Sequence, residues 1–260
     1  MSGPGIFEET TPRERLTSRL VQLVFVLVLA VLWYVSTNYW GISPILLPKP
    51  QLVLGELIDI LRSGEFWPDL LLTLSELAAA FAISMTSGVV LGLLISRSPV
   101  LVKVFEPLLA GVYAVPIILF LPLYVLFFGL GPASKIALGA TISFFPIVLN
   151  TIAGFANVDK LHVTAARSMG ASNWHLFRYV LMPGALPVML SGLRMGFTVA
   201  LLSIIGSETI ASLAGLGHRI VHLAEAMDMA RMFAYIVFVI AIAATLNAVV
   251  SGLESRGRRR

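Results

Sequence analysis

Ionisable side chains inside long apolar segments are the first residues in this sequence whose type and position could do chemistry. Glu76 and Arg194 each lie within such a segment, and Glu208 lies close to the end of one. An ionised group in hydrocarbon costs several kcal/mol unless it is paired or hydrated, so each should face the interior of a helical bundle. Two interpretations are open for Glu76: it lines a pathway, or it bonds to Arg194 or to a hydroxyl group on a neighbouring helix. Arg194 either attracts an anionic solute or holds its own helix against another.

The sequence offers little else for catalysis or metal binding. His218 and His222 are four residues apart, which suits two metal ligands on one helical face, but no third ligand lies near them and no metal site is expected. The absence of cysteine excludes disulfides, thiol catalysis and Cys-ligated metals. The chain has no G-x-x-x-x-G-K-S/T motif and no Gly-Lys pair, so it cannot bind ATP through a P-loop. Any process that this protein drives would therefore draw its energy from a partner or from an ion gradient.

The composition indicates whether these residues lie in water or in a membrane. Of the 260 residues, 58% are apolar and 12% are charged, with a mean hydropathy of +0.92; about 25% charged residues are typical of a soluble domain. The composition therefore predicts an all-α integral membrane protein, because a helix satisfies its own backbone groups over the roughly 30 Å of hydrocarbon that about 20 residues cross. Six such helices are expected, at Leu20–Tyr39, Leu71–Ser96, Leu108–Phe128, Lys135–Phe155, Gly184–Ile205 and Met232–Gly252.

The positive charges orient these six helices. Lys and Arg residues concentrate on the cytoplasmic side of membrane proteins, and placing the N-terminus in the cytoplasm puts most of them there. Both termini are then cytoplasmic, with a polar tail at 1–19, a transmembrane domain at 20–252 and a basic tail at 253–260. The first apolar segment is too long for a cleaved signal peptide and has no small-x-small cleavage site after it, so it is expected to remain as a signal anchor.

The loop between the fourth and fifth predicted helices is polar and, in this topology, cytoplasmic. Asp159 is placed to cap a first short helix, and Gly170 fits the left-handed position that follows a helix. Ser172 is placed to cap a second short helix, which Pro183 is expected to end where the fifth span begins. On the residues alone, this two-helix projection either lies on the lipid surface, anchored by Trp174, or contacts another protein.

The spacing in this loop resembles the signature of a known protein family. In binding-protein-dependent ABC importer permeases the pattern is E-A-A, three residues, G, nine residues and I-x-L-P, and this sequence has T-A-A at 164–166, Gly170, Val180, Met182 and Pro183 at the same spacing. Thr164 replaces the glutamate of the family, which removes the carboxylate from which a salt bridge could form. The resemblance implies that the loop, 156–183, couples the chain to an ATPase. Its coupling residues are Thr164, Ala165, Ala166, Arg167, Gly170, Ala171, Ser172, Trp174 and Pro183.

Three further stretches resemble the same family in the same order. ILLPKPQLV at Ile45–Val53 resembles the start of the transporter core. VYAVPIILFLPLYVLFFGLGPASKI at Val112–Ile136 resembles the third span and the following turn, and GSETIASLAGLGHRI at Gly206–Ile220 resembles the outer segment. Within the family, these stretches look closest to the nitrate, sulfonate and taurine branch. The resemblance covers roughly residues 44–252 and implies a fold like that of type I ABC importer permeases.

The resemblance also implies a division of labour among subunits. Two permease copies, expected as a homodimer, form the pathway; two ABC ATPase subunits bind ATP and magnesium; and a periplasmic or lipid-anchored protein delivers the solute. The chain itself is then a non-catalytic subunit without a cofactor, in the bacterial inner membrane. The branch implies a small anion such as nitrate, a sulfonate, taurine or bicarbonate, with a thiamine-pyrimidine precursor or another aromatic or heterocyclic compound as the alternative. A stand-alone secondary transporter has less support, because no paired internal repeat is found.

Two prolines, a tyrosine and a glutamate complete the candidate pathway and gate. Pro116 and Pro122 remove backbone donors inside the third predicted span, and the freed carbonyl groups are tolerated at membrane depth only in protein contacts or beside a hydrated cavity. Together with Tyr113 they either line the pathway or kink a packing helix. In the family the segment around Glu208 lies near the outer gate, so Glu208 is a gate candidate, with a salt bridge or a helix cap as the alternative. A short re-entrant or surface helix is expected just after it.

Small residues recur every four positions on two of the predicted spans. Ser84, Gly88 and Gly92 share one face of the second span, and Gly192 and Gly196 share one face of the fifth. Faces of this kind let helices approach closely. We therefore expect these two spans to pack tightly against neighbours.

Overall fold

The computed structural model describes residues 12–258, and every regular element in that range is helical. The elements are α1 (Pro12–Asn38), α2 (Pro50–Ser63), α3 (Trp67–Ser96), α4 (Pro99–Tyr113), the 3-10 turn η1 (Ile117–Phe120), α5 (Leu121–Phe128), α6 (Pro132–Ala156), α7 (Lys160–Ser168), α8 (Asn173–Leu176), the π turn η2 (Phe177–Leu181), α9 (Met182–Ile210), α10 (Leu216–Glu225) and α11 (Met229–Arg258). Most of the predicted N-terminal tail, 1–11, and the last two residues of the basic tail, 259–260, lie outside the described range. The expected all-α fold class is confirmed.

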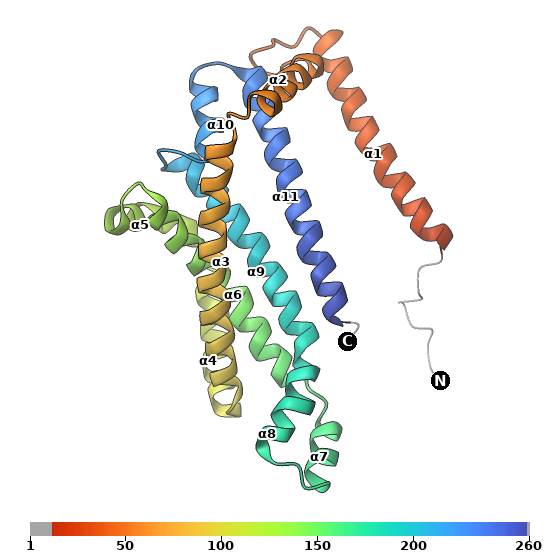
Figure 1. Ribbon diagram of the computed structural model, residues 1–260, viewed down its shortest axis with the longest axis vertical. Coiled ribbons are helices and arrows are strands. Elements are labelled where there is room, and N and C mark those ends of the chain that lie inside the picture. The colour runs from red at the N-terminus through yellow and green to blue at the C-terminus, as the bar shows by residue number, and fades with distance from the viewer. Residues whose placement is uncertain (1–11, 259–260) are drawn as a thin grey trace.

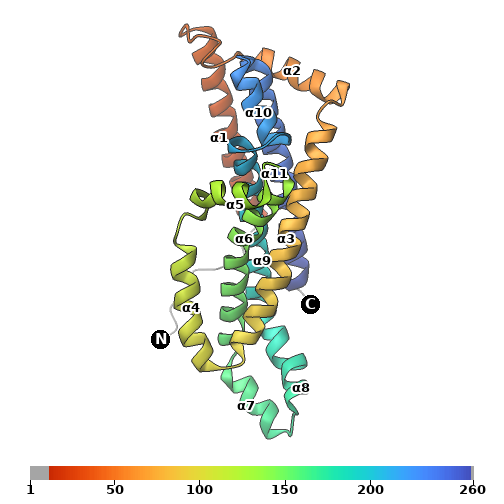
Figure 2. The same ribbon diagram turned by 90° about the vertical axis from the view of Figure 1, so that its left-hand side faces the viewer.

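The long helices form an elongated bundle with α7 and α8 at one end and α2 and α10 at the other (Figure 1; Figure 2). We call the first the cytoplasmic end and the second the outer end, following the charge-based topology. In the middle, α6 packs against both α3 and α9. α1 leans away from the bundle in Figure 1. It contacts the rest of the chain near its own C-terminal end, where Trp33 Nε1 donates a hydrogen bond of 3.0 Å to the carbonyl oxygen of Pro48.

Glycines let the three central helices approach closely. A Cβ atom on Gly92 would lie 2.6 Å from Cβ of Thr151 on α6. A Cβ atom on Gly196 would lie 2.6 Å from Cγ1 of Ile147, and one on Gly88 would lie 2.9 Å from Cγ2 of the same side chain. Larger residues would force α3 and α9 away from α6. The expected close packing of the small-residue faces is confirmed at these glycines.

The third predicted span is broken rather than straight. α4 and the following η1–α5 segment meet at an angle of 70°. Pro116 has no N–H for a helical hydrogen bond and disfavours a helical conformation in the residue before it, so the chain bends there. Pro122 lies in the first turn of α5, where a missing N–H is tolerated. The described residues therefore contain 5 helices that could span a membrane, or 6 if the bent pair counts as one span.

The fifth predicted span begins earlier than expected. Helical structure is continuous over the 38 residues Asn173–Ile210, so the prediction that Pro183 ends the second cytoplasmic helix was wrong. The π turn η2 precedes the proline, and the N–H of Met182 donates to the carbonyl oxygen of Phe177, five residues back. Pro183 then occupies the first turn of α9, where no N–H is required. The second cytoplasmic helix and the fifth span form one continuous rod.

Two short helices lie at the outer end, and one of them was not expected from the sequence. α2 has Pro50 in its first turn and ends at Gly64, which has a φ of +69°. Its Val53 and Ile60 side chains are buried in an apolar cluster that also contains Leu216 of α10 and residues of α11. α10 is the surface helix that was expected between the last two spans. Both helices are therefore fixed to the bundle by apolar contacts.

Candidate functional site

The cytoplasmic end is a two-helix projection, α7 and α8 with the turn between them, which we call the knuckle (159–176). Asp159 Oδ1 accepts a hydrogen bond of 2.8 Å from the N–H of Leu161 and caps α7. Ser172 Oγ accepts a hydrogen bond of 3.3 Å from the N–H of His175 and caps α8. Both caps agree with the expectation from the sequence.

The turn between the two helices depends on Gly170. Its φ is +81°, in the left-handed region that was expected. The N–H of Gly170 donates to the carbonyl oxygen of Arg167 at 3.0 Å. The N–H of Ala171 donates to the carbonyl oxygen of Ala166, also at 3.0 Å. This pair of hydrogen bonds is a Schellman turn, and it fixes the direction in which the chain leaves α7 for α8.

Stacked aromatic rings connect the knuckle to the bundle. The Trp174 and Phe177 rings lie 6.0 Å apart at 27°. The Phe177 and Phe155 rings lie 6.1 Å apart at 4°, and Phe155 belongs to the end of α6. Stacks of this kind stabilise beyond the area that they bury. The knuckle is therefore held by α6 as well as by the helix that continues into α9.

One face of α7 is apolar and exposed. Leu161, Ala165 and Met169 recur at every fourth position, and the exposed fractions of Leu161 and Met169 are 71% and 82%. Thr164, which replaces the glutamate of the family pattern, donates from Oγ1 to the carbonyl oxygen of Lys160 on its own helix at 2.8 Å. Exposed apolar side chains at the tip of a projection are typical of a contact with another molecule.

The outer end contains a second cluster, built around Glu208. Its Oε1 accepts a hydrogen bond of 2.6 Å from Thr73 Oγ1 on α3, and its Oε2 accepts one of 2.7 Å from the N–H of Gly217. Thr73 Oγ1 in turn accepts a hydrogen bond of 3.0 Å from the N–H of Leu216. Glu208 and Thr73 are both buried. Together they satisfy the first N–H groups of α10, as a helix cap does.

The Gly-Leu-Gly sequence before α10 fits this cluster. Gly215 has a φ of +107°, and its N–H donates to Oδ1 of Asp69 at 3.0 Å. A Cβ atom on Gly217 would lie 2.7 Å from Cβ of Glu208, so the carboxylate approaches only because no side chain is present. These contacts favour the helix-cap interpretation of Glu208. Its role as a gate stays a prediction.

Two more buried ionisable residues lie beside Glu208. Glu76 is 1% exposed and Lys135 is 0% exposed, so Glu76 faces the bundle interior as expected. Lys135 Nζ donates to the carbonyl oxygens of Leu130 and Gly131 and interacts electrostatically with both carboxylates. Among the described residues, Glu76 Oε2 has no hydrogen-bond partner. Lys135 was not among the functional residues predicted from the sequence, because it is the first residue of a predicted span. The criterion applied to Glu76, an ionisable side chain in an apolar segment, applies to Lys135 equally.

Arg194 is not the partner of Glu76. Its Nη1 lies 3.3 Å from Oε2 of Glu254 on α11, and the Glu254 side chain is largely buried. Ser191 Oγ donates to the other oxygen of the same carboxylate at 3.2 Å. These contacts join α9 to α11 and favour the interpretation in which Arg194 holds its span against a neighbour. The pairing of Glu76 with Arg194 is therefore a wrong prediction.

An open, apolar cavity of about 390 Å³ lies at the bend between α4 and α5. Its lining includes Ile117, Phe120, Phe145 and Tyr124, and none of the lining residues is charged. Tyr124 donates a hydrogen bond of 2.8 Å to the Thr141 hydroxyl. The predicted pathway residue Tyr113 stacks on Phe145 with ring centroids 5.8 Å apart. The segment after Pro116 thus lines the cavity directly, whereas Tyr113 contacts it only through Phe145.

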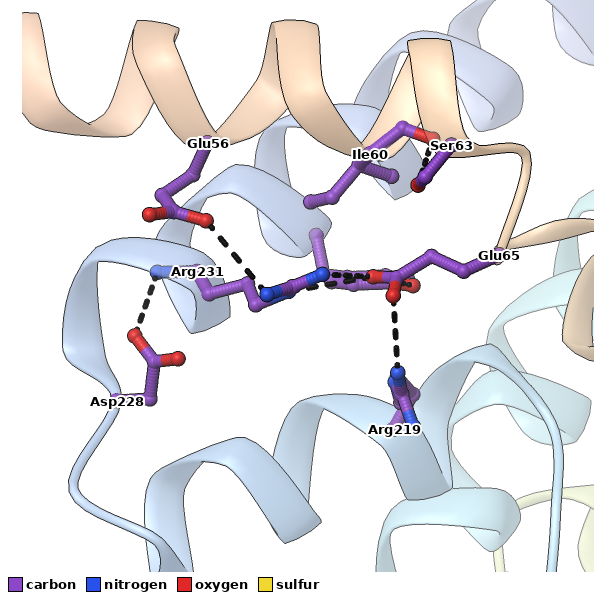
Figure 3. Close-up of polar contacts among 8 residues, drawn as sticks. Glu56, Ile60, Ser63, Glu65, Arg219, Asp228 and Arg231 are labelled. Atoms are coloured by element: carbon purple, nitrogen blue, oxygen red, sulfur yellow. Dashed lines mark hydrogen bonds and ion pairs between the residues drawn. The ribbon is translucent and has the colours of Figure 1, made fainter.

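An ion-pair network at the outer end was not anticipated (Figure 3). Arg231 Nη2 lies 2.7 Å from Oε1 of Glu65, and Tyr235 donates to the same oxygen at 3.1 Å. Arg219 of α10 approaches the other oxygen at 3.6 Å, and Arg231 also reaches Glu56 of α2 at 4.0 Å. The network joins α2, α10 and α11 to Glu65 in the short link between α2 and α3. No sequence signal pairs these residues, because they lie more than 150 positions apart.

Glu65 makes the stability of this network depend on pH. Burial alone would raise the pKa of Glu65, but hydrogen bonds from Arg231 and Tyr235 outweigh it and lower that pKa below the ordinary 4.5. A lowered pKa means that the stabilisation is complete above pH 4.5 and is lost as pH falls through the lowered value. We expect Glu65→Gln to cost roughly 1–3 kcal/mol at neutral pH and progressively less below pH 4.5.

The measurement is the melting temperature of the purified chain in detergent from pH 3 to 8. Glu225→Gln is the matched control, because Glu225 is an exposed carboxylate on α10, and it should shift the curve little at any pH. A Glu65→Gln deficit of the same size at pH 3 and pH 7 would contradict the assignment.

The two histidines lie on α10. The ring centroids of His218 and His222 are 6.2 Å apart. Within residues 12–258, no group of three or more His, Cys, Asp or Glu side chains is arranged to hold a metal ion.

Comparisons with known proteins identify the family of this chain. Residues 84–259 match the family described as binding-protein-dependent transport system inner membrane component. The taurine transport system permease protein TauC of Escherichia coli is 32% identical over 234 residues, which cover 88% of this chain and 85% of TauC. The riboflavin transport system permease protein RibX of Chloroflexus aurantiacus is 31% identical, covering 81% of this chain and 82% of RibX.

Solved structures agree on the fold. The MetNI methionine ABC transporter in an inward-facing conformation matches with a TM-score of 0.60 at 16% identity, over 76% of this chain and 96% of that one. A chain of an amino acid ABC transporter crystallised with histidines matches with a TM-score of 0.61 at 23% identity, over 78% of this chain and 97% of that one. The chain therefore belongs to the binding-protein-dependent transport system inner membrane components and is a non-catalytic, membrane-spanning permease subunit of an ABC transporter.

Proposed function

We propose that this permease forms the solute pathway of an ATP-driven importer as a dimer of two identical chains. Two ABC ATPase subunits would bind at the cytoplasmic end, and a periplasmic or lipid-anchored binding protein would deliver solute at the outer end of the bacterial inner membrane. The observation that supports this best is the knuckle: a projection ordered by two caps and a Schellman turn, with an exposed apolar face on α7.

The knuckle is well placed to pass a displacement to the pathway. It continues without a break into the rod Asn173–Ile210, which at 1.5 Å per residue is about 57 Å long. Near the far end of this rod, Glu208 binds the first turn of α10. Closure of an ATPase against 156–183 would therefore tilt a lever that also moves the outer cluster. Packed bundles amplify such small shifts because they switch between discrete arrangements.

The proposed pathway and gate follow the predicted residues. Tyr113, Pro116 and Pro122 border the bend between α4 and α5, and we propose that this bend faces the pathway. Glu76 and Glu208 would act at the outer gate as part of their buried cluster with Lys135. Arg194, half exposed beside Glu254, would contribute mainly by holding α9 to α11. The proposed coupling residues remain Thr164, Ala165, Ala166, Arg167, Gly170, Ala171, Ser172, Trp174 and Pro183.

We propose a small anion of the sulfonate or taurine type as solute, from the similarity to TauC and to the aliphatic sulfonate permease SsuC of Bacillus subtilis, which is 28% identical over 230 residues. An aromatic or heterocyclic compound is the second candidate. It is favoured by the uncharged, aromatic lining of the cavity at α5. Relatives named for riboflavin and formylaminopyrimidine transport support it as well.

The test is uptake into proteoliposomes that contain the permease and the ATPase that co-purifies with it, with the binding protein encoded nearby added outside. Taurine, an alkanesulfonate, riboflavin and formylaminopyrimidine are compared, with and without internal ATP. ATP-dependent uptake of one class identifies the solute. Uptake driven by an ion gradient without ATP would instead indicate a secondary transporter and refute the proposal.

A further inference from the structure

A cavity of about 700 Å³ lies between the cytoplasmic end of the bundle and the knuckle. Its volume is in the range of ligand-binding pockets. Leu93, Phe155 and Trp174 provide apolar wall, while Arg97 and Arg167 provide positive charge, and no carboxylate is among the lining residues. Two cations thus face one cavity from different helices, the end of α3 and the last turn of α7.

These two arginines lack a carboxylate partner, as Arg62 and Arg178 do, but they alone among the described arginines line this cavity. In residues 12–258, Arg97 and Arg167 make no side-chain ion pair or hydrogen bond, and both are exposed. Arg194, Arg219 and Arg231 each have a carboxylate partner. Like charges that share a cavity without a counter-charge favour the binding of an anion.

The position of the cavity indicates where that anion comes from. Arg97 follows directly on the apolar span Trp67–Ser96, and Phe155 lies at the end of the span Pro132–Ala156. In the predicted topology the cavity is therefore at the level where lipid headgroups meet the cytoplasm. Trp side chains such as Trp174 favour this level, and paired basic residues between helices on the cytoplasmic side suit anionic headgroups.

We propose that this cavity binds an anionic phospholipid of the cytoplasmic leaflet. Arg97 and Arg167 would hold the phosphate group, and the acyl chains would lie against Leu93 and Phe155. An acidic residue of the ATPase is the competing occupant, but most of the lining residues are apolar, which suits an acyl chain: Leu93 and Phe155 from α3 and α6, and Trp174, Leu176, Phe177 and Leu181 from α8 and η2. Two of the proposed coupling residues, Arg167 and Trp174, line the cavity, whereas Ala165 and Met169 of the exposed α7 stripe line a different hollow.

The consequence is a link between lipid composition and the knuckle. The cavity is bounded by α3 and α6 on one side and by α7 and α8 on the other. A bound lipid would therefore bridge the spans and the coupling segment through the two arginines. Lipids with a charged phosphate but a neutral overall headgroup would bind more weakly, because their own ammonium group opposes the arginines.

The experiment is native mass spectrometry of the purified full-length chain in mild detergent, titrated with dioleoylphosphatidylglycerol or dioleoylphosphatidylcholine. We expect the wild type to retain phosphatidylglycerol about tenfold more tightly, because the ammonium group of phosphatidylcholine is repelled by the two arginines. Arg97→Gln/Arg167→Gln should reduce that preference to near one. Arg178→Gln is the matched control: Arg178 is in the same segment but lies over the Tyr179 ring, outside the cavity.

Arg97→Lys/Arg167→Lys keeps both charges and should retain most of the preference, which separates charge from folding. An unchanged preference in the Gln double variant would overturn the proposal. So would displacement of phosphatidylglycerol by millimolar glycerol 3-phosphate, which would assign the cavity to a free phosphate compound. If the Gln double variant lost its co-purified ATPase but bound lipid as the wild type does, the cavity would instead be assigned to contact with the ATPase. Because lipid retention is measured without ATPase, this test is independent of the importer proposal.

Discussion

Replacing Gly170 by valine is expected to lower ATP-driven uptake by about tenfold or more while the bundle still folds. A left-handed backbone costs an L-residue roughly 1–2 kcal/mol, and a β-branched residue tolerates the φ of +81° at Gly170 least. Space is not the obstacle, since nothing lies within 4 Å of a Cβ atom built there. The substitution therefore changes the angle between α7 and α8, because valine would strain the Schellman turn that sets this angle.

Gly170→Asn is the matched control, because asparagine enters the left-handed region more readily than other side chains. We expect it to retain most of the uptake and most of the co-purified ATPase. Elution of both variants as monodisperse protein shows that the bundle is intact. Equal uptake by the valine and asparagine variants would show that the turn geometry is not needed for coupling.

Replacing Glu208 by alanine is expected to destabilise the outer end by about 2–4 kcal/mol, the cost of leaving buried hydrogen-bonding groups without their partner. The change leaves the N–H of Gly217 without its acceptor, and the Thr73 hydroxyl loses its acceptor as well. The first turn of α10 would then be held less firmly, because one of the groups that cap it is lost. In detergent the melting temperature should fall by about 10 °C.

The control for this variant is Glu225→Ala, which removes an exposed carboxylate from the same α10 helix and should shift the melting temperature by less than about 2 °C. Limited proteolysis gives a second readout. We expect cleavage in 211–229 to accelerate in Glu208→Ala and to be unchanged in the control. Equal melting temperatures for the two variants would show that the buried network does not hold α10.

The local features of the knuckle were predictable from the sequence because their causes are local. Asp159 and Ser172 each cap a helix within three residues of themselves, and Gly170 forms a turn within five. The spans were predictable for a similar reason, since their apolar length is a property of one segment. Pro183 was the exception. Its position suggested a helix end, but a π turn upstream lets the helix continue through it.

The outer clusters were not predictable because their partners are distant. Glu208 bonds to Thr73, 135 positions away, and Glu65 bonds to Arg231, 166 positions away. Such pairs follow from which helices the fold brings together, and no spacing rule contains that information. The same limit explains why Arg194 was one of the partners considered for Glu76. Both are ionisable groups of opposite charge within predicted spans, and the sequence alone does not show that they belong to different clusters.

The most direct test of the importer proposal is the composition of the complex isolated from native membranes. The tagged chain is purified in mild detergent, and the co-purified proteins are quantified by mass spectrometry. The proposal predicts one P-loop ATPase per permease chain, retained with Gly170→Asn and lost with Gly170→Val. Full-length, monodisperse permease without an ATPase in the wild-type sample would contradict it.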